Sequence, residues 1–502
     1  MKDFMKKNHF FTYSKMCVLA LTGASALFLA SCAKDGFDDE SFDSGVSNTQ
    51  VSAISADNIT ITPSADGKSQ TISWPVVMGA GGYRVNLIDV SNPDEPIIND
   101  SIVDGCTVTG KREEDVNYLL TVQALGNTKK NNTDSPEVAT KTFSTFTPTF
   151  ATIPAGSDLT EWFAANPTPA DSIGVNLNYD LEGGASYTLS GLLDFDGQAV
   201  TLRSNSKNDH AKIVYTTEES TITFTADFNV KYLDFDCAAM DKAKGVFAFS
   251  KTSTVEAANA VDPDTYKWTG PFFDKVLIAN SNFDNVTGMF FWDNQVKTGV
   301  KTMMIDNCLV HLTPAADSDL KNRGVIWTNK AGHINDFTVT NSTFYEPDGW
   351  AFDYKYFYQA GGVSAHEVYN SEATTNSVNY TNSTFYHIAW NNGQWGNYNR
   401  MQGRTWSYWV MTNCIFYDCS TSGSVPRRFL HGQAYAASPQ NKTFNNNTYM
   451  KNDGTFQDPQ SYDQSGTIIE EDPMFANPAA GDFTISGATQ VARKTGDPRW
   501  LP

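Results

Sequence analysis

The sequence predicts an all-β protein in which a small β-sandwich is followed by a right-handed parallel β-helix. Aromatic residues make up 13% of the chain, and Gly and Pro are scattered through it, which is typical of a folded β protein and not of a disordered one. Short runs of alternating apolar and polar residues fill positions 51–146. From Asn280 to Asn446 a short motif recurs, which indicates a coil-by-coil repeat array.

The N-terminus has the pattern of a secretory signal. Its basic segment contains Lys2, Lys6, Lys7 and Lys15. The apolar run Val18–Ala30 that follows is too short to span a bilayer comfortably. This run ends in Leu29-Ala30-Ser31-Cys32, which resembles the bacterial lipobox. The resemblance implies that residues 1–31 are a lipoprotein signal peptide and that Cys32 is lipidated, which would anchor the protein in an outer membrane.

Residues 32–50 are rich in Asp, Ser and Gly, so we expect an acidic flexible tether. Its acidic residues resemble a surface-export signal of lipoproteins in glycan-foraging gut bacteria, which implies a surface-exposed protein. The net charge is -20, and it becomes -23 once residues 1–31, with four Lys and one Asp, are removed. Nucleic acid is therefore not an expected partner, because no basic stripe is available to neutralise phosphates.

Residues 51–146 carry the features expected of the sandwich. Trp74, then Gly81-Gly82-Tyr83-Arg84-Val85, then Tyr118–Ala124 resemble a fibronectin type III module. The resemblance implies that the Trp fills the core, that the late Tyr lies at a corner, and that the module is a spacer. Cys106 is the only cysteine in this stretch, so an immunoglobulin-type disulfide is excluded.

The repeat unit reads apolar-x-Asn-small-x-apolar. Its asparagines are Asn280, Asn307, Asn341, Asn382, Asn413 and Asn446, at intervals of 27 to 41 residues. Because Asn tolerates the left-handed backbone and coils stack about 4.8 Å apart, we expect the chain to bend at each Asn and the amides to form a ladder. We expect Cys237, Cys308 and Cys414 at the interior position of Ser281. A β-propeller would need a steadier period, and a leucine-rich repeat would need leucines.

The β-helix is expected over residues 150–502, with a cap at each end. A short helix beginning after Asp158 is predicted to cover the first strand edge. Glu471–Ile485 resembles the closing segment of pectate-lyase-like β-helix proteins. Taken as a whole, the chain resembles an uncharacterised lipoprotein family, built of domains of unknown function and found among polysaccharide-utilisation systems.

Insertions between coils are the expected walls of a glycan groove, because aromatic faces stack on sugar rings and cations pair with uronate carboxylates. The candidate glycan-binding residues are Trp327, Trp350, Tyr354, Tyr356, Trp390, Trp395, Arg400, Trp406 and Arg428. A pectin-type acidic polymer is the leading hypothesis for the partner. The charge of -23 opposes such a polymer at long range, so a neutral glycan stays open.

The resemblance to pectate lyases also implies an alternative enzymatic function. Such enzymes abstract a proton beside a uronate carboxylate with an Arg or Lys base, often with calcium. The candidate bases are Arg323, Lys355, Arg404 and Arg427, and Asp348 and Asp353 are candidate calcium ligands. No cofactor is otherwise required. An inverting hydrolase is disfavoured because no adjacent Asp pair occurs between 290 and 440, and a structural or adhesive role remains a third hypothesis.

Overall fold

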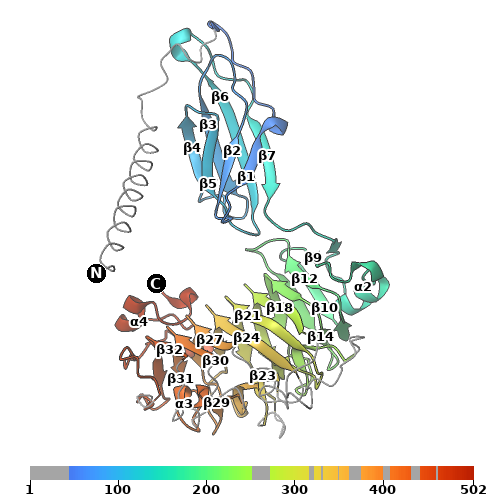
Figure 1. Cartoon of the computed structure of the whole chain (residues 1–502), viewed down its shortest axis with the longest axis vertical. Helices are drawn as coiled ribbons and strands as arrows, with labels where there is room; N and C mark the ends of the chain where they lie inside the picture. Colours follow the sequence, from blue (N-terminus) through green and yellow to red (C-terminus); the bar gives the residue numbers. More distant parts are fainter. Residues whose placement is uncertain are drawn as a thin grey trace, which may run out of the picture. The chain divides into compact units, whose positions relative to one another are not determined.

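The computed structural model describes residues 45–251, 272–315, 322–328, 332–348, 350–360, 375–398, 407–430, 441–458 and 462–502 of the chain. Two compact units are present, Met1–Phe146 and Thr147–Pro502, and both are built mainly of strands (Figure 1). The predicted signal peptide, Cys32 and the site candidates Arg400, Arg404 and Trp406 lie outside the described residues. Within the described ranges, no helix is both long enough and apolar enough to cross a membrane.

The first unit consists of two antiparallel sheets. A three-stranded sheet has the order β1 (Thr60–Pro63), β2 (Ser69–Ser73), β5 (Thr107–Lys111). A four-stranded sheet has the order β4 (Ile98–Val103), β3 (Ala80–Asp89), β6 (Asn117–Gly126), β7 (Ala139–Ser144). The short 3-10 helix η1 (Ala56–Asn58) precedes β1, and η2 (Thr128–Lys130) lies between β6 and β7.

Alternation along β6 explains how this unit forms a core. Tyr118, Leu120, Val122 and Ala124 are buried every second residue, while the residues between them are more exposed. Trp74 is also buried and packs edge-on against Tyr83, with ring centroids 5.4 Å apart. The Tyr118 hydroxyl accepts the N–H of Glu113 at 2.9 Å, so this Tyr ties β6 to the connection that precedes it. The expected core position of the Trp is confirmed, and the late Tyr is buried in β6.

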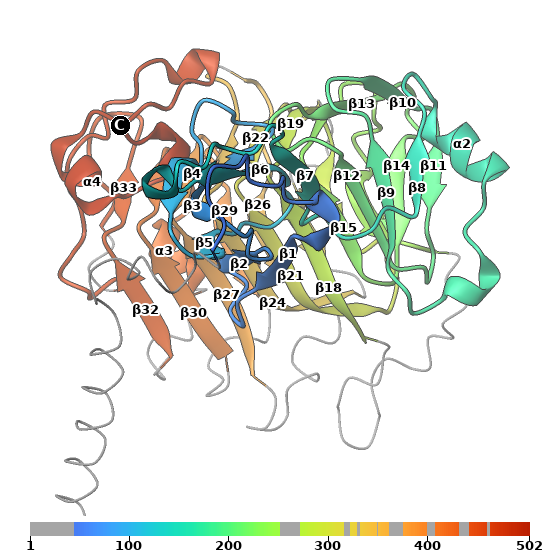
Figure 2. The ribbon, with the colours of Figure 1, turned by 90° about the horizontal axis from the view of Figure 1, so that it is seen from above.

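The second unit is a coil whose successive turns contribute strands to three parallel sheets (Figure 2). The ten-stranded sheet contains β8 (Ala151–Ile153), β9 (Leu177–Leu181), β12 (Val200–Ser204), β15 (Phe228–Lys231), β18 (Phe272–Ala279), β21 (Gly299–Asp306), β24 (His333–Thr340), β27 (Asn376–Thr381), β30 (Ser407–Thr412) and β32 (Lys442–Asn445). The nine-stranded sheet contains β10 (Ser186–Leu189), β13 (Ala211–Tyr215), β16 (Leu233–Asp236), β19 (Asn282–Val286), β22 (Leu309–Leu312), β25 (Thr343–Tyr345), β28 (Thr384–Tyr386), β31 (Ile415–Tyr417) and β33 (Thr448–Met450). The seven-stranded sheet contains β11 (Leu192–Asp194), β14 (Thr221–Phe224), β17 (Gly245–Phe249), β20 (Met289–Trp292), β23 (Gly324–Thr328), β26 (Tyr356–Ala360) and β29 (Gln394–Tyr398). The predicted parallel β-helix is confirmed.

The repeated asparagines lie at the bend between the ten-stranded and nine-stranded sheets, as predicted. All six have positive φ, between 46° and 54°. The amide of Asn413 donates to Asn382 at 3.0 Å, and that of Asn446 donates to Asn413 at 3.1 Å. The ladder of amide bonds is interrupted once, because the amide of Asn341 donates to the Asp306 carboxylate at 2.8 Å. Stacking of identical bends therefore stabilises this corner of the coil.

The residue after each bend asparagine points into the coil. Cys308 and Cys414 are fully buried there, as expected, and the Cys308 N–H donates to the Ser342 hydroxyl at 3.0 Å. The expectation for Cys237 is wrong. In the strand register Asp236 pairs with Asp284, so Cys237 follows β16 and is not equivalent to Ser281. The bend that corresponds to Asn280 falls at Tyr232, with φ of 59°.

We expect Asn413→Ala to destabilise the second unit more than Asn413→Gly does. Alanine loses the amide ladder and must also adopt the left-handed backbone, a combined cost of about 2–3 kcal/mol. Glycine loses the ladder but adopts this backbone freely, so its cost is about 1 kcal/mol. Chemical denaturation of both variants measures the difference. Equal losses would show that the backbone conformation at position 413 is unimportant.

Both ends of the coil are covered. Helix α2 (Leu159–Ala165) begins where predicted, because the Asp158 carboxylate accepts the N–H of Glu161 at 3.1 Å. Its Phe163 packs against Phe195, with ring centroids 5.0 Å apart, so it covers the first turn of the core. A 3-10 helix, η3 (Ala170–Ser172), follows α2.

The C-terminal segment runs back along the coil instead of only closing its end. It contains η6 (Pro478–Ala480), α4 (Ala488–Arg493) and η7 (Pro498–Trp500). The Gly496 N–H donates to the Asn413 carbonyl at 2.9 Å, and the Arg499 guanidinium donates to the Asn307 amide oxygen at 2.9 Å. The buried Asp497 carboxylate accepts the Thr343 hydroxyl at 2.8 Å. This segment therefore bonds to several successive turns of the coil.

Candidate functional site

Three predicted glycan-binding aromatics are core residues. Trp395 is fully buried and stacks on Phe357, with ring centroids 4.6 Å apart. Tyr354 is 1% exposed, and its hydroxyl donates to the Gly288 carbonyl. Trp327 is 6% exposed and lies parallel to Trp292. The assignment of Trp395, Tyr354 and Trp327 to a glycan surface is corrected, because each ring is buried against other parts of the protein.

Several other candidates bond to the protein itself. The Trp350 indole donates to the Pro314 carbonyl at 2.7 Å, and Arg428 donates to the Ser422 carbonyl at 2.6 Å. The Arg323 guanidinium lies over the Trp327 ring, 4.9 Å from its centroid. The Lys355 ammonium donates to the Asn392 carbonyl at 2.7 Å. These contacts hold connections between strands, and none of the four side chains is among those that line the pocket described below. Tyr356, the first residue of β26, is half-buried and does not line that pocket either.

The two candidate calcium ligands also have protein partners. The Asp348 carboxylate accepts the Tyr386 hydroxyl at 2.6 Å. Asp353 is buried, and its two oxygens accept the N–H groups of Ala389 at 3.0 Å and Asn391 at 2.7 Å. In the described ranges, no three His, Cys, Asp or Glu side chains are grouped so that they could hold a metal ion.

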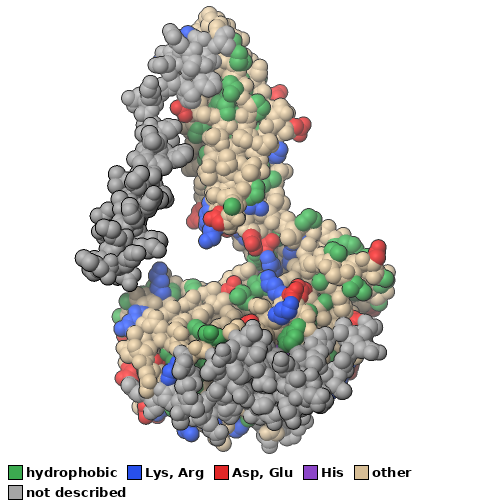
Figure 3. Space-filling model, in the orientation of Figure 1, with side chains coloured by type: hydrophobic (Ala, Val, Ile, Leu, Met, Phe, Trp, Pro, Cys, Tyr) green, Lys and Arg blue, Asp and Glu red, His purple; other side chains and the backbone are tan. Residues whose placement is uncertain are grey.

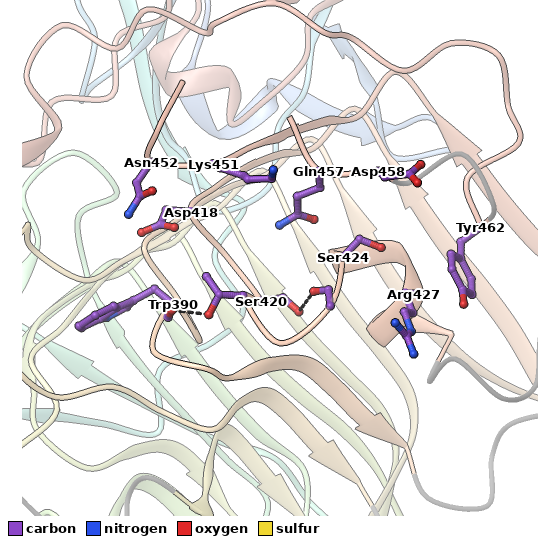
Figure 4. Close-up of a pocket in the computed structure, with 12 residues that line it drawn as sticks. Trp390, Asp418, Ser420, Ser424, Arg427, Lys451, Asn452, Gln457, Asp458 and Tyr462 are labelled. Carbon is purple, nitrogen blue, oxygen red and sulfur yellow. Dashed lines mark hydrogen bonds between the residues drawn. The ribbon is translucent and has the colours of Figure 1, made fainter. Parts of the chain in front are cut away.

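A pocket of about 490 Å³ opens where the last turns of the coil leave the nine-stranded sheet (Figure 4). Its lining comes from the connections that follow β28, β31 and β33, together with helix α3 (Val425–Phe429). The lining residues are Trp390, Asp418, Ser420, Thr421, Gly423, Ser424, Arg427, Lys451, Asn452, Gln457, Asp458 and Tyr462. The pocket thus contains two of the predicted residues, Trp390 and Arg427.

Two aromatic and two cationic side chains line this pocket (Figure 4). Trp390 is at one end and Tyr462 is at the other, beside Arg427, while Lys451 lies above the centre. Gln457 fixes the back wall, because its amide accepts the Val425 N–H at 2.8 Å and donates to the Cys419 carbonyl at 2.7 Å. Arg427 and Lys451 are exposed. Their charges are therefore accessible to a solute in the pocket.

Acidic groups lie directly behind Trp390. Its indole N–H donates to the Glu346 carboxyl at 3.1 Å, and its ring stacks on His387, with centroids 4.7 Å apart. The His387 ring nitrogen Nδ1 lies 2.9 Å from Asp418, which is itself buried. Burial raises the pKa of Asp353 to about 7. Burial and the nearby Asp353 charge raise the pKa of Glu346 well above its ordinary value.

Sequence reasoning missed most of the pocket. Lys451, Gln457 and Tyr462 follow the last bend asparagine, outside the insertions in which a groove wall was expected. Asp418 directly follows β31 and belongs to none of the motifs recognised in the sequence. A signal was present in the repeat itself, because Glu346, His387, Asp418 and Lys451 each immediately follow a strand of the nine-stranded sheet. Such equivalent positions stack in a coil.

Charged side chains elsewhere are mixed in sign. On the face shown in Figure 3, acidic and basic side chains are interspersed over the described surface of each unit. Because salt screens distant charges, local cations such as Arg427 and Lys451 can attract an anion at short range despite the net charge of -20.

The fold and pocket define a chain in which a unit of two antiparallel sheets accompanies a parallel β-helix with a polar, aromatic-lined pocket. Three family models match it in succession, each described as a domain of unknown function: DUF4992 over residues 5–189, DUF4957 over 185–347 and DUF5123 over 337–500. The first match spans the sandwich and the first turns of the coil, so its boundary differs from that of the structural units. The chain is also similar to the solved structure of pectate lyase PelI from Erwinia chrysanthemi in complex with tetragalacturonic acid, with 10% identity over 73% of this chain and 84% of that chain, and a TM-score of 0.21. No curated protein matches the chain.

Proposed function

We propose that this protein is an outer-membrane lipoprotein, anchored through Cys32 and exposed at the cell surface, that binds polysaccharide with its β-helix. A pectin-type acidic glycan is the leading ligand class. The observation that carries the proposal is the pocket, in which Trp390 and Tyr462 can stack on sugar rings while Arg427 and Lys451 can pair with carboxylates. Binding requires no cofactor, although calcium could bridge an acidic polymer to surface carboxylates.

The proposal assigns different roles to the two units. The first unit would be a fibronectin type III-like spacer, which is supported by its three-plus-four strand arrangement and by the Tyr118 hydroxyl bond near the start of β6. The second would be a right-handed β-helix, the hand expected when right-twisted strands are joined in parallel. The acidic tether would give the binding unit reach from the membrane.

We expect the double variant Arg427→Ala/Lys451→Ala to bind polygalacturonate at least tenfold more weakly than the parent. Each lost charge-assisted hydrogen bond contributes about 1.5–3 kcal/mol when it is made to a ligand. Affinity electrophoresis and calorimetry on the mature chain, with Cys32 replaced by Ser, measure the change. The charge-matched control is Lys68→Ala/Lys301→Ala, which removes two exposed cations on strands or turns outside the pocket.

The same assay separates the alternatives. Unchanged affinity in the double variant would contradict the proposal for this pocket. If neutral galactan retards the protein in the gel and polygalacturonate does not, the ligand is a neutral glycan. Growth of ultraviolet absorbance from unsaturated products, lost in Arg427→Ala, would assign a lyase, and loss of that signal with a chelator would add calcium to its mechanism.

A further inference from the structure

The turn that carries Trp390 has an unusual backbone. Residues 387–393 link β28 to β29, and His387, Ala389 and Asn392 have φ of 58°, 56° and 57°. The left-handed conformation costs roughly 1–2 kcal/mol for a residue with a Cβ, less for Asn. A turn with three such residues in six positions needs bonds from outside to hold it.

Two carboxyl groups of the preceding turn of the coil supply those bonds. Asp353 accepts the N–H groups of Ala389 and Asn391, at 3.0 and 2.7 Å. Glu346 accepts the indole N–H of Trp390 at 3.1 Å. Three consecutive residues are thus held by one buried pair, Asp353 through the backbone and Glu346 through the side chain. Figure 4 shows Trp390 at the end of the pocket, so this pair sets where one of its walls lies.

We propose that Glu346 and Asp353 are positioning residues that hold Trp390 against the pocket, and that the turn they hold opens as the pair loses protons. The consequence for glycan affinity rests on the proposed function of the pocket, whereas the opening of the turn does not. Trp390 would therefore be in its binding position at mildly acidic pH and released from it progressively as the pH rises.

The charges around the pair determine the direction of the effect. The titratable groups that face it are Tyr354 beside Asp353, His387 and Asp418 from the next two turns, and Cys419. His387 is already paired with Asp418 at 2.9 Å. Burial raises the pKa of both acids, that of Asp353 to about 7. In the opened turn the carboxyls regain water and their ordinary pKa values.

The linkage follows from these values. A raised acid pKa means that the closed turn holds protons that the opened turn releases. The stabilisation of the closed turn is complete below about pH 4, the ordinary carboxyl pKa, and is lost as the pH rises through about 7 for Asp353. Each carboxyl shifts the opening equilibrium by up to about tenfold per pH unit within its window.

The first test follows Trp390 itself and needs no ligand. The fluorescence of the parent minus that of Trp390→Phe reports this indole, and we expect it to shift toward a solvent-exposed emission as the pH rises from about 4 to 8. Glu346→Gln keeps an acceptor for the indole but removes one titrating group, so it should lose at least half of the pH slope. His387, which stacks on Trp390, is unchanged in Glu346→Gln, so that loss is assigned to Glu346.

The second test measures binding. We expect the parent to bind polygalacturonate at least tenfold more weakly at pH 8 than at pH 5, since only the closed fraction binds. Glu346→Gln should bind at both pH values with less than a threefold difference, whereas Glu346→Leu should bind as weakly as Trp390→Ala. If Glu346→Leu does not fold, Asp353→Asn replaces it as the weakened variant. Asn has only one acceptor oxygen for the N–H groups of Ala389 and Asn391, so Asp353→Asn should also bind more weakly than the parent.

The outcomes separate the two proposals. A Trp390 signal that is flat with pH in the parent, or equally steep in Glu346→Gln, overturns the positioning role. Absence of binding to any glycan, with the fluorescence behaving as expected, contradicts the proposed function and leaves the positioning role supported.

Discussion

Arg203→Met is expected to lower the free energy of unfolding of the second unit by about 3–5 kcal/mol, because it leaves a buried carboxylate without its cationic partner. Arg203 is 1% exposed, and its guanidinium lies 2.7 Å from the Asp180 carboxylate. It also donates to the hydroxyl and the carbonyl of Thr147, each at 2.7 Å. One side chain therefore ties the start of the unit to β9 and β12. Chemical denaturation followed by circular dichroism measures the loss.

An exposed ion pair provides the matched control. Lys212 lies 3.5 Å from Asp236, and their side chains are 48% and 26% exposed, so water already screens the pair. We expect Lys212→Met to cost less than about 1 kcal/mol. Arg203→Met with Asp180→Leu should recover part of the stability, since an apolar pair leaves no buried charge. A loss below that of Lys212→Met would show that Arg203 does not stabilise the first turns of the coil.

Trp395→Ala is expected to destabilise the second unit by about 3–5 kcal/mol, the range found when a large buried ring is removed. Trp395 is fully buried, stacks on Phe357 and packs edge-on against Phe385 and Phe416, with centroids 4.8 and 4.9 Å apart. Its removal leaves a cavity in the middle of an aromatic cluster. Thermal and chemical unfolding of the variant measure the cost.

Trp390→Ala is the control, because this tryptophan lies only five residues away and lines the pocket. We expect its cost in stability to be about 1 kcal/mol, chiefly from the lost bond to Glu346, together with a clear loss of glycan binding. The two variants should therefore separate stability from binding. If Trp395→Ala weakened binding while retaining full stability, the core assignment of Trp395 would be contradicted.

The sequence by itself determined the features that repeat at each turn of the coil. The bend asparagines and the small residue after them could be predicted, because left-handed backbone and interior crowding act within a few residues of the chain. The cap at Asp158 and the alternation in β6 are equally local, since a helix start and a strand face depend on neighbours along the sequence.

Only the tertiary structure decided which aromatics face solvent and what forms the pocket. Tyr354, Trp390 and Trp395 come from similarly aromatic stretches of sequence, yet Tyr354 and Trp395 are buried in the core whereas Trp390 lines the pocket. The pocket joins Trp390, Arg427 and Lys451, which come from successive turns separated by dozens of residues. The carboxyl pair behind it arises in the same way. A side chain's neighbours across coils are set by stacking, and local sequence does not contain that information.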